Sequence, residues 1–128
     1  KLDKLESYEL LAERIAMQKI LLTRLLRYLK GKGKQIASYG APAKGNTMLN
    51  YCQIRELEYA LEDLPQKQGL FTPGTRIPIV SPEYAHAHEP DYYLMLAWNY
   101  EKAILEKEQA YLKKGGRFII PVEGIRIV

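Results

Sequence analysis

Cysteine is nearly missing from this sequence of 128 residues, which has only Cys52. A single thiol cannot form a disulfide within the chain, and it cannot supply a multi-cysteine zinc site. Such sparing use of cysteine is typical of a reducing compartment, so we expect a cytoplasmic protein. Because no histidine near it in the sequence is identified as an activating partner, we interpret Cys52 as a buried or partly buried thiol.

Long apolar runs and runs of one charge are missing as well. No stretch reaches the ~18 apolar residues that span a bilayer, and no signal segment opens the chain, so we expect a soluble protein without a membrane partner. The net charge of +4 is spread over 19 basic and 15 acidic residues. Without a basic run, the chain is not expected to bind nucleic acid. With 47% apolar residues and ten tyrosines, it can bury one core, which predicts a single domain.

Residues 1–30 show helical periodicity, interrupted at Gln18. Apolar side chains recur three and four residues apart at Tyr8, Leu11, Ile15, Leu22, Leu25 and Leu29. This spacing predicts an amphipathic helix, which glycines at positions 31 and 33 end. The helix packs on its own sheet or on a neighbouring domain, or it pairs in a dimer, and the sequence leaves these alternatives open. Because the pattern starts at residue 1 without a capping signal, we expect a segment of a longer protein.

After this helix, strand and helix patterns alternate. Strands are expected over residues 36–39, 57–61, 77–80, 92–97, 118–120 and 125–128. Helices are expected over residues 44–51, after Ser81 and Pro82, and from the predicted cap Asn99 to about residue 114. Strands separated by helices pair in parallel through right-handed crossovers. The sequence therefore predicts a leading helix over residues 1–33 and an open, mostly parallel α/β sheet covered by helices over residues 34–128. In such a sheet, ligands bind at the carboxyl ends of the strands.

The loop GAPAKGNT, residues 40–47, follows the first predicted strand. A loop that enters a helix N-terminus favours an anion. A Walker A loop has its lysine directly after the second glycine, whereas Lys44 precedes Gly45, which argues against hydrolysis of ATP or GTP. The dinucleotide pattern G-x-G-x-x-G is incomplete, although Glu62 and Asp63 lie at the distance of a ribose-binding acid. The alternative is that the glycines and the proline only shape a tight turn.

Two further stretches follow predicted strands. The glycines and prolines of KQGLFTPGTRIPI, residues 67–79, fix a loop path, and long loops in compact domains are usually functional or disordered. LAWNY places Trp98 and Asn99 at the end of the central strand, and the alternative for Trp98 is a partly covered core position. His86 and His88 lack further ligands and are interpreted as surface residues, so no metal site is expected. A solvated helix face accounts for Glu101, Glu106 and Glu108.

Four ordered blocks, YGAPAKGNTMLNY, KQGLFTPGTRIPI, LMLAWNYEKAI and GGRFIIPV, together resemble the C-terminal domain of bacterial S-adenosylmethionine-dependent sugar C-methyltransferases. The resemblance runs from Ile36 to the end of the chain and also includes the leading helix. It implies a Rossmann-like domain that follows a zinc domain and a methyltransferase domain in one longer protein.

The resemblance also implies a division of labour. A nucleotide-linked 4-keto deoxysugar, such as a dTDP sugar, is held between the last two domains. The methyltransferase domain binds S-adenosylmethionine and removes the α proton, an enolate forms, and the enolate attacks the methyl group. Zinc belongs to the first domain only. No catalytic residue and no metal ligand are therefore expected in this chain, which alone is expected to be inactive. The upstream methyltransferase domain is the expected protein partner.

The residues implied to bind substrate are those that match the family blocks. They are Gly40, Ala41, Lys44, Gly45, Asn46, Thr47, Lys67, Gln68, Gly74, Thr75, Trp98 and Asn99. We hypothesise that Lys44 and the amides of the turn that follows it face the diphosphate, with Asn46 and Lys67 as further contacts. The sequence departs from the family pattern at two places. It has EDLPQKQG where family members commonly have a stretch rich in aspartate and asparagine, and Glu123 where they often have a second proline. The rival hypothesis is a non-catalytic Rossmann-like nucleotide-binding or assembly module, and cofactor-dependent oxidoreduction ranks third.

Overall fold

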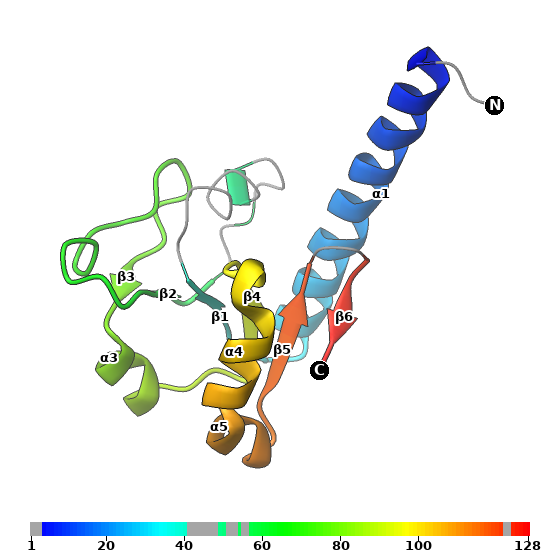
Figure 1. Ribbon diagram of the computed structural model, residues 1–128. Coiled ribbons are helices and arrows are strands. Elements are labelled where there is room, and N and C mark those ends of the chain that lie inside the picture. The colour runs from blue at the N-terminus through cyan, green and yellow to red at the C-terminus, as the bar shows by residue number, and fades with distance from the viewer. Residues whose placement is uncertain (1–3, 41–48, 51–53, 55–56, 122–123) are drawn as a thin grey trace.

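A computed structural model describes residues 4–40, 49–50, 54, 57–121 and 124–128 of the chain (Figure 1). The helices are α1 (Lys4–Gly31), α3 (Pro82–Ala87), the 3₁₀ helix η1 (Trp98–Tyr100), α4 (Glu101–Lys107) and α5 (Gln109–Lys113). The strands are β1 (Ile36–Tyr39), β2 (Ala60–Leu61), β3 (Ile79–Val80), β4 (Tyr92–Met95), β5 (Arg117–Ile120) and β6 (Arg126–Ile127). Of the helix predicted over residues 44–51, Leu49 and Asn50 are described and are helical, and the rest lies outside the described residues.

The strands form one sheet in the order β3-β2-β1-β4-β5-β6. Every neighbouring pair from β3 to β5 is parallel, and β6 runs antiparallel to β5. The predicted open, mostly parallel sheet is thus confirmed. β2 is shorter than the strand predicted over residues 57–61, although backbone hydrogen bonds continue before it. The amide of Glu58 donates to the carbonyl of Ile36, and the amide of Ser38 donates to the carbonyl of Tyr59, both at 2.8 Å.

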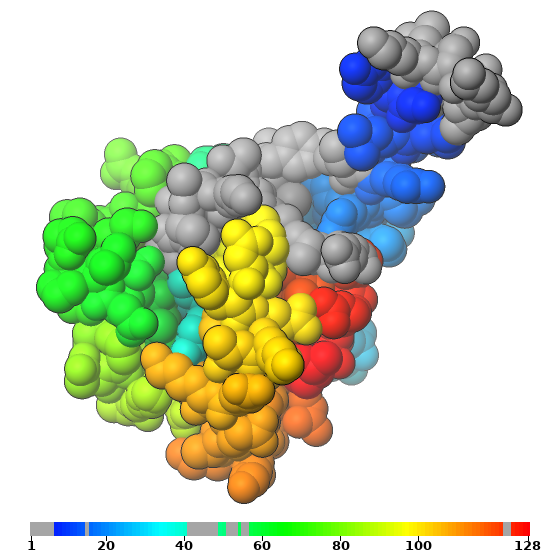
Figure 2. Space-filling model, viewed as in Figure 1, coloured from blue at the N-terminus to red at the C-terminus, as the bar shows by residue number. Residues whose placement is uncertain are grey.

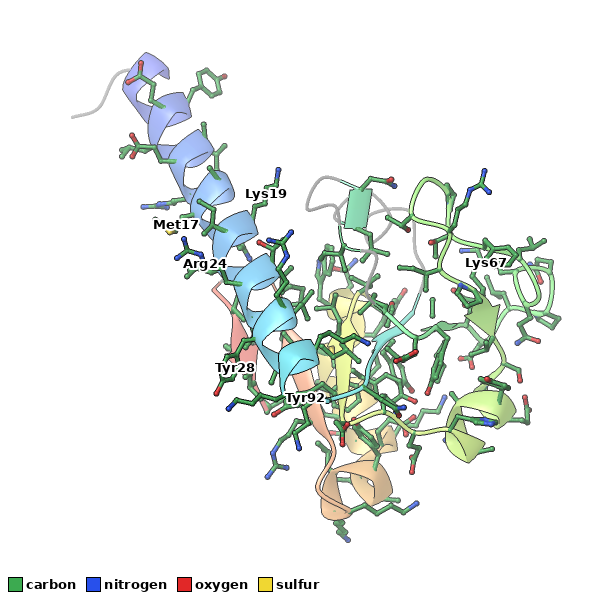
Figure 3. All side chains as sticks on the ribbon, turned by 180° about the vertical axis from the view of Figure 1, so that it is seen from behind. Met17, Lys19, Arg24, Tyr28, Lys67 and Tyr92 are labelled. Carbon is green, nitrogen blue, oxygen red and sulfur yellow. The ribbon has the colours of Figure 1, made fainter. Side chains whose placement is uncertain are left out.

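Helices cover both faces of the sheet. Successive side chains of each strand point to opposite faces, so the buried strands give the sheet two apolar faces, each of which packs against helices. One core lies under α1 and includes Ile36, Leu94 and Ile119 from the strands. The other lies under α3, α4 and α5 and includes residues adjacent to these along the same strands, such as Ala37 and Tyr93. Figure 1 and the reverse view in Figure 3 show α1 on one side of the sheet and α4 on the other. The result is a three-layer α/β/α domain.

Helix α1 packs on the sheet only through its C-terminal half. Leu22, Leu26 and Leu29 are buried in the core, whereas Tyr8 and Leu11 are exposed. The N-terminal half projects beyond the rest of the molecule (Figure 1). The interruption at Gln18 has a structural reason, because the side-chain amide of Gln18 donates a hydrogen bond to the carbonyl of Pro121 at the end of β5. The predicted amphipathic helix is therefore confirmed, with its apolar face only partly used within this chain.

Tyrosines fill the core opposite α1. The rings of Tyr39 and Tyr93 meet edge to face at 5.3 Å, and Phe118 stacks on Tyr93 at 5.6 Å. The hydroxyl of Tyr111 donates to the carbonyl of Pro90 at 3.0 Å. The hydroxyl of Tyr39 donates to Oε2 of Glu108 at 2.6 Å. Each of these hydroxyls therefore enters the core with a hydrogen-bond partner, as buried polar groups require.

Glu108 is buried, and the expectation that it lies on a solvated face was wrong. The helix predicted to run unbroken to about residue 114 is interrupted at this residue, whose φ of −100° and ψ of 29° separate α4 from α5. This break lies where the carboxylate accepts the hydrogen bond from Tyr39. Nε2 of His86 lies 3.9 Å from its other oxygen. Tyr39 lies 69 residues earlier in the chain, so the local sequence around Glu108 carried no sign of this partner.

Burial raises the pKa of Tyr39, Tyr93 and Tyr111, and the hydrogen bond to Glu108 raises the pKa of Tyr39 further. An unfolded tyrosine ionises near pH 10, so above that pH the unfolded chain loses protons that the folded chain retains. The stability contributed by these raised pKa values is fully present below pH 10 and is lost as the pH rises above it.

We therefore expect the free energy of unfolding to stay level from pH 8 to about pH 10 and to fall above it, by about 1.4 kcal/mol per pH unit for each such tyrosine. Urea unfolding at several pH values measures this slope. Tyr39→Phe lowers stability at pH 8 by about 1–3 kcal/mol, because Glu108 loses its donor, and it makes the alkaline loss less steep. Tyr100→Phe is the control, since Tyr100 is 68% exposed. A stability that stays constant up to pH 11 would contradict this account.

Candidate binding site at the strand ends

The order of the sheet reverses between β1 and β4. From β1 the chain continues outward to β2 and β3, and from β4 it continues in the opposite direction to β5. The amides of Leu96 and Ala97, just after β4, both donate to the carbonyl of Tyr39, at 3.1 and 3.3 Å. Loops that leave two such strands in opposite directions open a crevice at the carboxyl ends of the strands. Three of the predicted strand ends, those after β1, β2 and β4, meet at this edge.

A cavity of about 380 Å³ opens at this edge of the sheet. Its lining comes from the ends of β1, β2 and β4 and from one face of η1 and α4. The described lining residues are Tyr39, Gly40, Leu61, Glu62, Asp63, Leu64, Lys67, Ala97, Tyr100, Ala103, Ile104 and Lys107. Figure 2 shows the segment after β2 (green) and α4 (yellow) facing each other, with the end of β1 (cyan) between them. The volume is in the range of small-molecule sites, which is roughly 300–1,000 Å³.

Two carboxylates and two lysines line this cavity. Glu62 and Asp63 follow β2, and Nζ of Lys67 lies 3.9 Å from Oε2 of Glu62. Nζ of Lys107 on α4 lies 3.9 Å from Oδ2 of Asp63 across the cavity. Ion pairs this long and this accessible contribute less than about 1 kcal/mol, so a ligand anion can draw the lysines toward itself at little cost. Figure 3 shows Lys67 on the loop between β2 and β3.

Gly40 begins the loop GAPAKGNT at the floor of the cavity. Its φ of 94° lies in the left-handed region, which favours glycine. Its amide donates to the carbonyl of Leu61 at 2.9 Å, and its carbonyl accepts a hydrogen bond from Oγ of the buried Ser38 at 2.7 Å. The chain therefore turns sharply at the switch point of the sheet. The predicted residues Ala41, Lys44, Gly45, Asn46 and Thr47 lie outside the described residues, and their role stays a prediction.

The loop KQGLFTPGT contributes its first residue to the cavity. Lys67 lines it, and the side-chain amide of Gln68 donates to the carbonyl of Glu62 at 2.8 Å, which holds the loop against the end of β2. Gly74 and Thr75 are not among the described lining residues. The hydroxyls of Thr75 and Thr72 are hydrogen-bonded at 2.6 Å, and Oγ1 of Thr72 also accepts from the amide of Ile77 at 2.9 Å. Thr75 and the unpredicted Thr72 thus hold the shape of the loop.

Trp98 and Asn99 lie on η1, and neither is among the described lining residues. Trp98 is half-buried against the core under α1, which agrees with its alternative interpretation as a core residue. Asn99 is exposed, and the prediction that it caps the following helix was wrong, since Tyr100 is the N-cap of α4 and makes no side-chain capping bond. The 3₁₀ turn after β4 sends Trp98 toward α1, while Ala97 and Tyr100 line the cavity.

Sequence reasoning missed the wall that α4 contributes. Tyr100, Ala103, Ile104 and Lys107 line the cavity at intervals of three, one and three residues. Residues with this spacing share one face of a helix, so the signal was present in the sequence. It went unrecognised because a mixture of tyrosine, alanine, isoleucine and lysine does not indicate a binding face until the helix is placed beside the strand ends.

The described residues show no site for a metal and no membrane span. No group of three or more histidine, cysteine, aspartate or glutamate side chains in this part of the chain could hold a metal ion. His86 and His88 are exposed, and the His88 ring stacks on Tyr84 at 4.1 Å, in agreement with their prediction as surface residues. Within the same residues, every helix is too short or too polar to cross a membrane.

Comparison with known proteins connects this architecture to a family. The sequence profile of the family described as the C-methyltransferase C-terminal domain matches residues 1–123. The chain is also 43% identical over 118 residues to the C-methyltransferase NovU of Streptomyces niveus. That alignment covers 91% of this chain and 27% of NovU, so the chain spans about a quarter of the length of this relative.

The loop that follows Lys67 depends on a close approach at Gly74, whose φ is 82°. The side-chain amide of Asn50 donates to the carbonyl of Pro73 at 3.0 Å, and a Cβ on Gly74 would collide with that amide. Gly74→Ala is therefore expected to lower the free energy of unfolding by about 2 kcal/mol, through backbone strain and through loss of the hydrogen bond of the displaced Asn50 side chain. Thermal unfolding measures this.

Gly69→Ala is the matched control for this substitution. Gly69 has nearly the same φ, 84°, but no atom lies within 4 Å of the point that a Cβ would occupy there. The Gly69→Ala variant is expected to lower the free energy of unfolding by about 1 kcal/mol, from backbone strain alone. Equal losses in the two variants would mean that the contact between Gly74 and Asn50 does not hold the loop.

Proposed function

Because the chain belongs to the family of C-methyltransferase C-terminal domains, we propose that it binds and positions the nucleotide-linked sugar that such an enzyme methylates. The observation that carries the proposal is the cavity at the switch point, where two lysines and two carboxylates surround an apolar floor. This is the edge at which open α/β sheets bind nucleotides. The proposed substrate is a dTDP-4-keto-deoxysugar or a sugar nucleotide of similar structure.

The cavity offers a suitable partner for each part of such a molecule. Tyr100 and Leu64 give flat or apolar surface for the base, and both are more than a third exposed. Asp63 and Glu62 can accept hydrogen bonds from sugar hydroxyls. Lys67 and Lys107 can turn from these carboxylates to the diphosphate, where a charge-assisted hydrogen bond is stronger. Lys44 and the turn amides after it are the remaining proposed contacts with the diphosphate.

The methyl donor and the base that removes the α proton are proposed to lie in other parts of the enzyme. S-adenosylmethionine supplies the methyl group in this chemistry. Besides Gly40 and Gly45, the turn after β1 has no further glycine, and the sequence contains no glycine-rich fingerprint of a methyl-donor site. Among the described residues no cluster of zinc ligands is found, and we propose that zinc is bound by another part of the enzyme. This domain is thus expected to be inactive alone and to act by holding the keto sugar toward the methyltransferase domain.

Calorimetric titration with dTDP, a dTDP sugar, NAD and ATP tests the proposal. The chain, or the chain joined to its upstream sequence, is expected to bind dTDP and the dTDP sugar in preference to NAD and ATP. Preference for NAD would favour oxidoreduction instead. If neither protein binds any of the four, the non-catalytic assembly module is the better account, and the proposal fails.

Substitutions of the lysines test the proposed contacts. Lys44→Ala and Lys107→Ala are each expected to weaken dTDP-sugar binding by about 1–3 kcal/mol, the range for a hydrogen bond to a charged group, without changing the unfolding temperature. Lys102→Ala is the control, because Lys102 is exposed on α4 and does not belong to the described cavity lining. Unchanged affinity in Lys44→Ala would place that residue outside the site.

A further inference from the structure

A second apolar stripe runs along α1, beside the one that packs on the sheet. It consists of Leu10, Met17, Leu21 and Tyr28, which we name the outer stripe. Their side chains are 41%, 55%, 50% and 62% exposed. At 3.6 residues per turn, all four fall within about 40° of the helix circumference and extend over about 27 Å along its axis. Figure 3 shows Met17 and Tyr28 on the same side of α1, with Lys19 on the other.

The spacing of the outer stripe is symmetric. Its members are separated by seven, four and seven residues, so the pattern is the same from either end of the helix. When two such helices lie antiparallel about a two-fold axis near position 19, Leu10 meets Tyr28 of the second copy and Met17 meets its Leu21. A two-fold interface requires this kind of self-complementary patch. We propose that the outer stripe is an antiparallel dimer interface between two copies of this chain.

Charges beside the outer stripe favour the antiparallel arrangement. Glu9 and Glu13 lie in the N-terminal half of α1, whereas Arg24 and Arg27 lie in its C-terminal half, and all four are exposed. Glu13 and Arg24 lie on the same flank of the stripe, within about 60° of its centre. About the same two-fold axis, Glu13 of each copy lies opposite Arg24 of the other, and Glu9 lies near Arg27. Arg14 comes level with Arg24 of the other copy but lies on the opposite flank of the stripe, so Glu13 is the nearer partner of Arg24. A parallel pair would instead bring the two basic C-terminal halves side by side, which is unfavourable.

The shape of the molecule leaves space for this arrangement. The N-terminal half of α1 projects from the domain, and the body of the domain lies beside the C-terminal half (Figures 1 and 2). In the antiparallel pair, the projecting half of each helix reaches along the half of the other that carries the domain. A groove of about 500 Å³, lined by Leu11, Arg14, Met17, Gln18 and Leu21 together with Gly124 and Ile125, opens at the middle of the stripe. It can receive an apolar side chain of the second copy.

The size of the outer stripe sets the expected strength of the dimer. One helix face about 27 Å long offers less than the ~800 Å² per partner of a typical stable interface, so a weak, reversible dimer is expected. Lys32 Nζ lies 5.6 Å from the centre of the Tyr28 ring and already covers part of one end of the stripe. The centre, at Met17 and Leu21, is therefore expected to contribute most.

Sedimentation equilibrium from about 10 µM to about 500 µM measures the association. The mass is expected to rise with concentration from 14.8 kDa toward twice that value. Leu21→Glu and Met17→Glu are each expected to weaken the dimer at least tenfold, and circular dichroism checks that they fold. Leu70→Glu is the matched control, because Leu70 has the same 55% exposure as Met17 but lies on the loop before β3.

A charge swap tests the orientation. Glu13→Arg alone and Arg24→Glu alone are each expected to weaken the dimer several-fold, because they place like charges opposite each other. The double variant is expected to regain wild-type affinity, which only antiparallel pairing of two copies predicts. A chain that stays monomeric at about 500 µM, a dimer that tolerates Leu21→Glu, or a double variant weaker than both single variants would each overturn the proposal.

Discussion

The parallel pairing of β1 with β4 is the constraint on which the rest of this domain depends. It is one of the longest parallel pairings in the described sheet, with Ile36 opposite Tyr92 and Tyr39 opposite Met95. Because the chain leaves these two strands in opposite directions, their pairing creates both the reversal of strand order and the crevice above it. Tyr39 connects these features. Its carbonyl accepts hydrogen bonds from the two amides after β4, its ring lies in the aromatic core, and the residue also lines the cavity.

The class of fold could be predicted from the sequence because it follows from local patterns. Short apolar runs separated by helical segments imply parallel pairing, and the edge at which the strands end follows from that pairing. Lys67 could be placed at this edge for the same reason. The direction in which a side chain points from a short turn could not be predicted from the sequence. Trp98 and Tyr100 are two residues apart and equally aromatic, and only the 3₁₀ geometry of η1 determines that Tyr100 lines the cavity.

Glu108 shows the other limit of sequence reasoning. A glutamate among lysines on a helix is normally solvated, and nothing in the neighbouring sequence indicates otherwise. Its burial depends on the hydroxyl of Tyr39, which comes from a strand at the centre of the sheet. Buried polar pairs between distant segments leave no periodic signal, because periodicity reports burial of apolar surface. For a similar reason, the sequence carries no sign of the hydrogen bond between the hydroxyls of Thr75 and Thr72. The ligand contact expected of Thr75 stays a prediction.

The central claim is that the cavity at the ends of β1, β2 and β4 is where this domain holds a nucleotide. Amide chemical shifts of the isotopically labelled chain, recorded with increasing dTDP, test that claim residue by residue. The largest shifts are predicted to cluster at the cavity lining, at Gly40, Asp63, Lys67, Ala97 and Tyr100. Shifts confined to the opposite edge of the sheet, around Gln35, Glu58 and Asp91, or spread evenly over the surface, would contradict it.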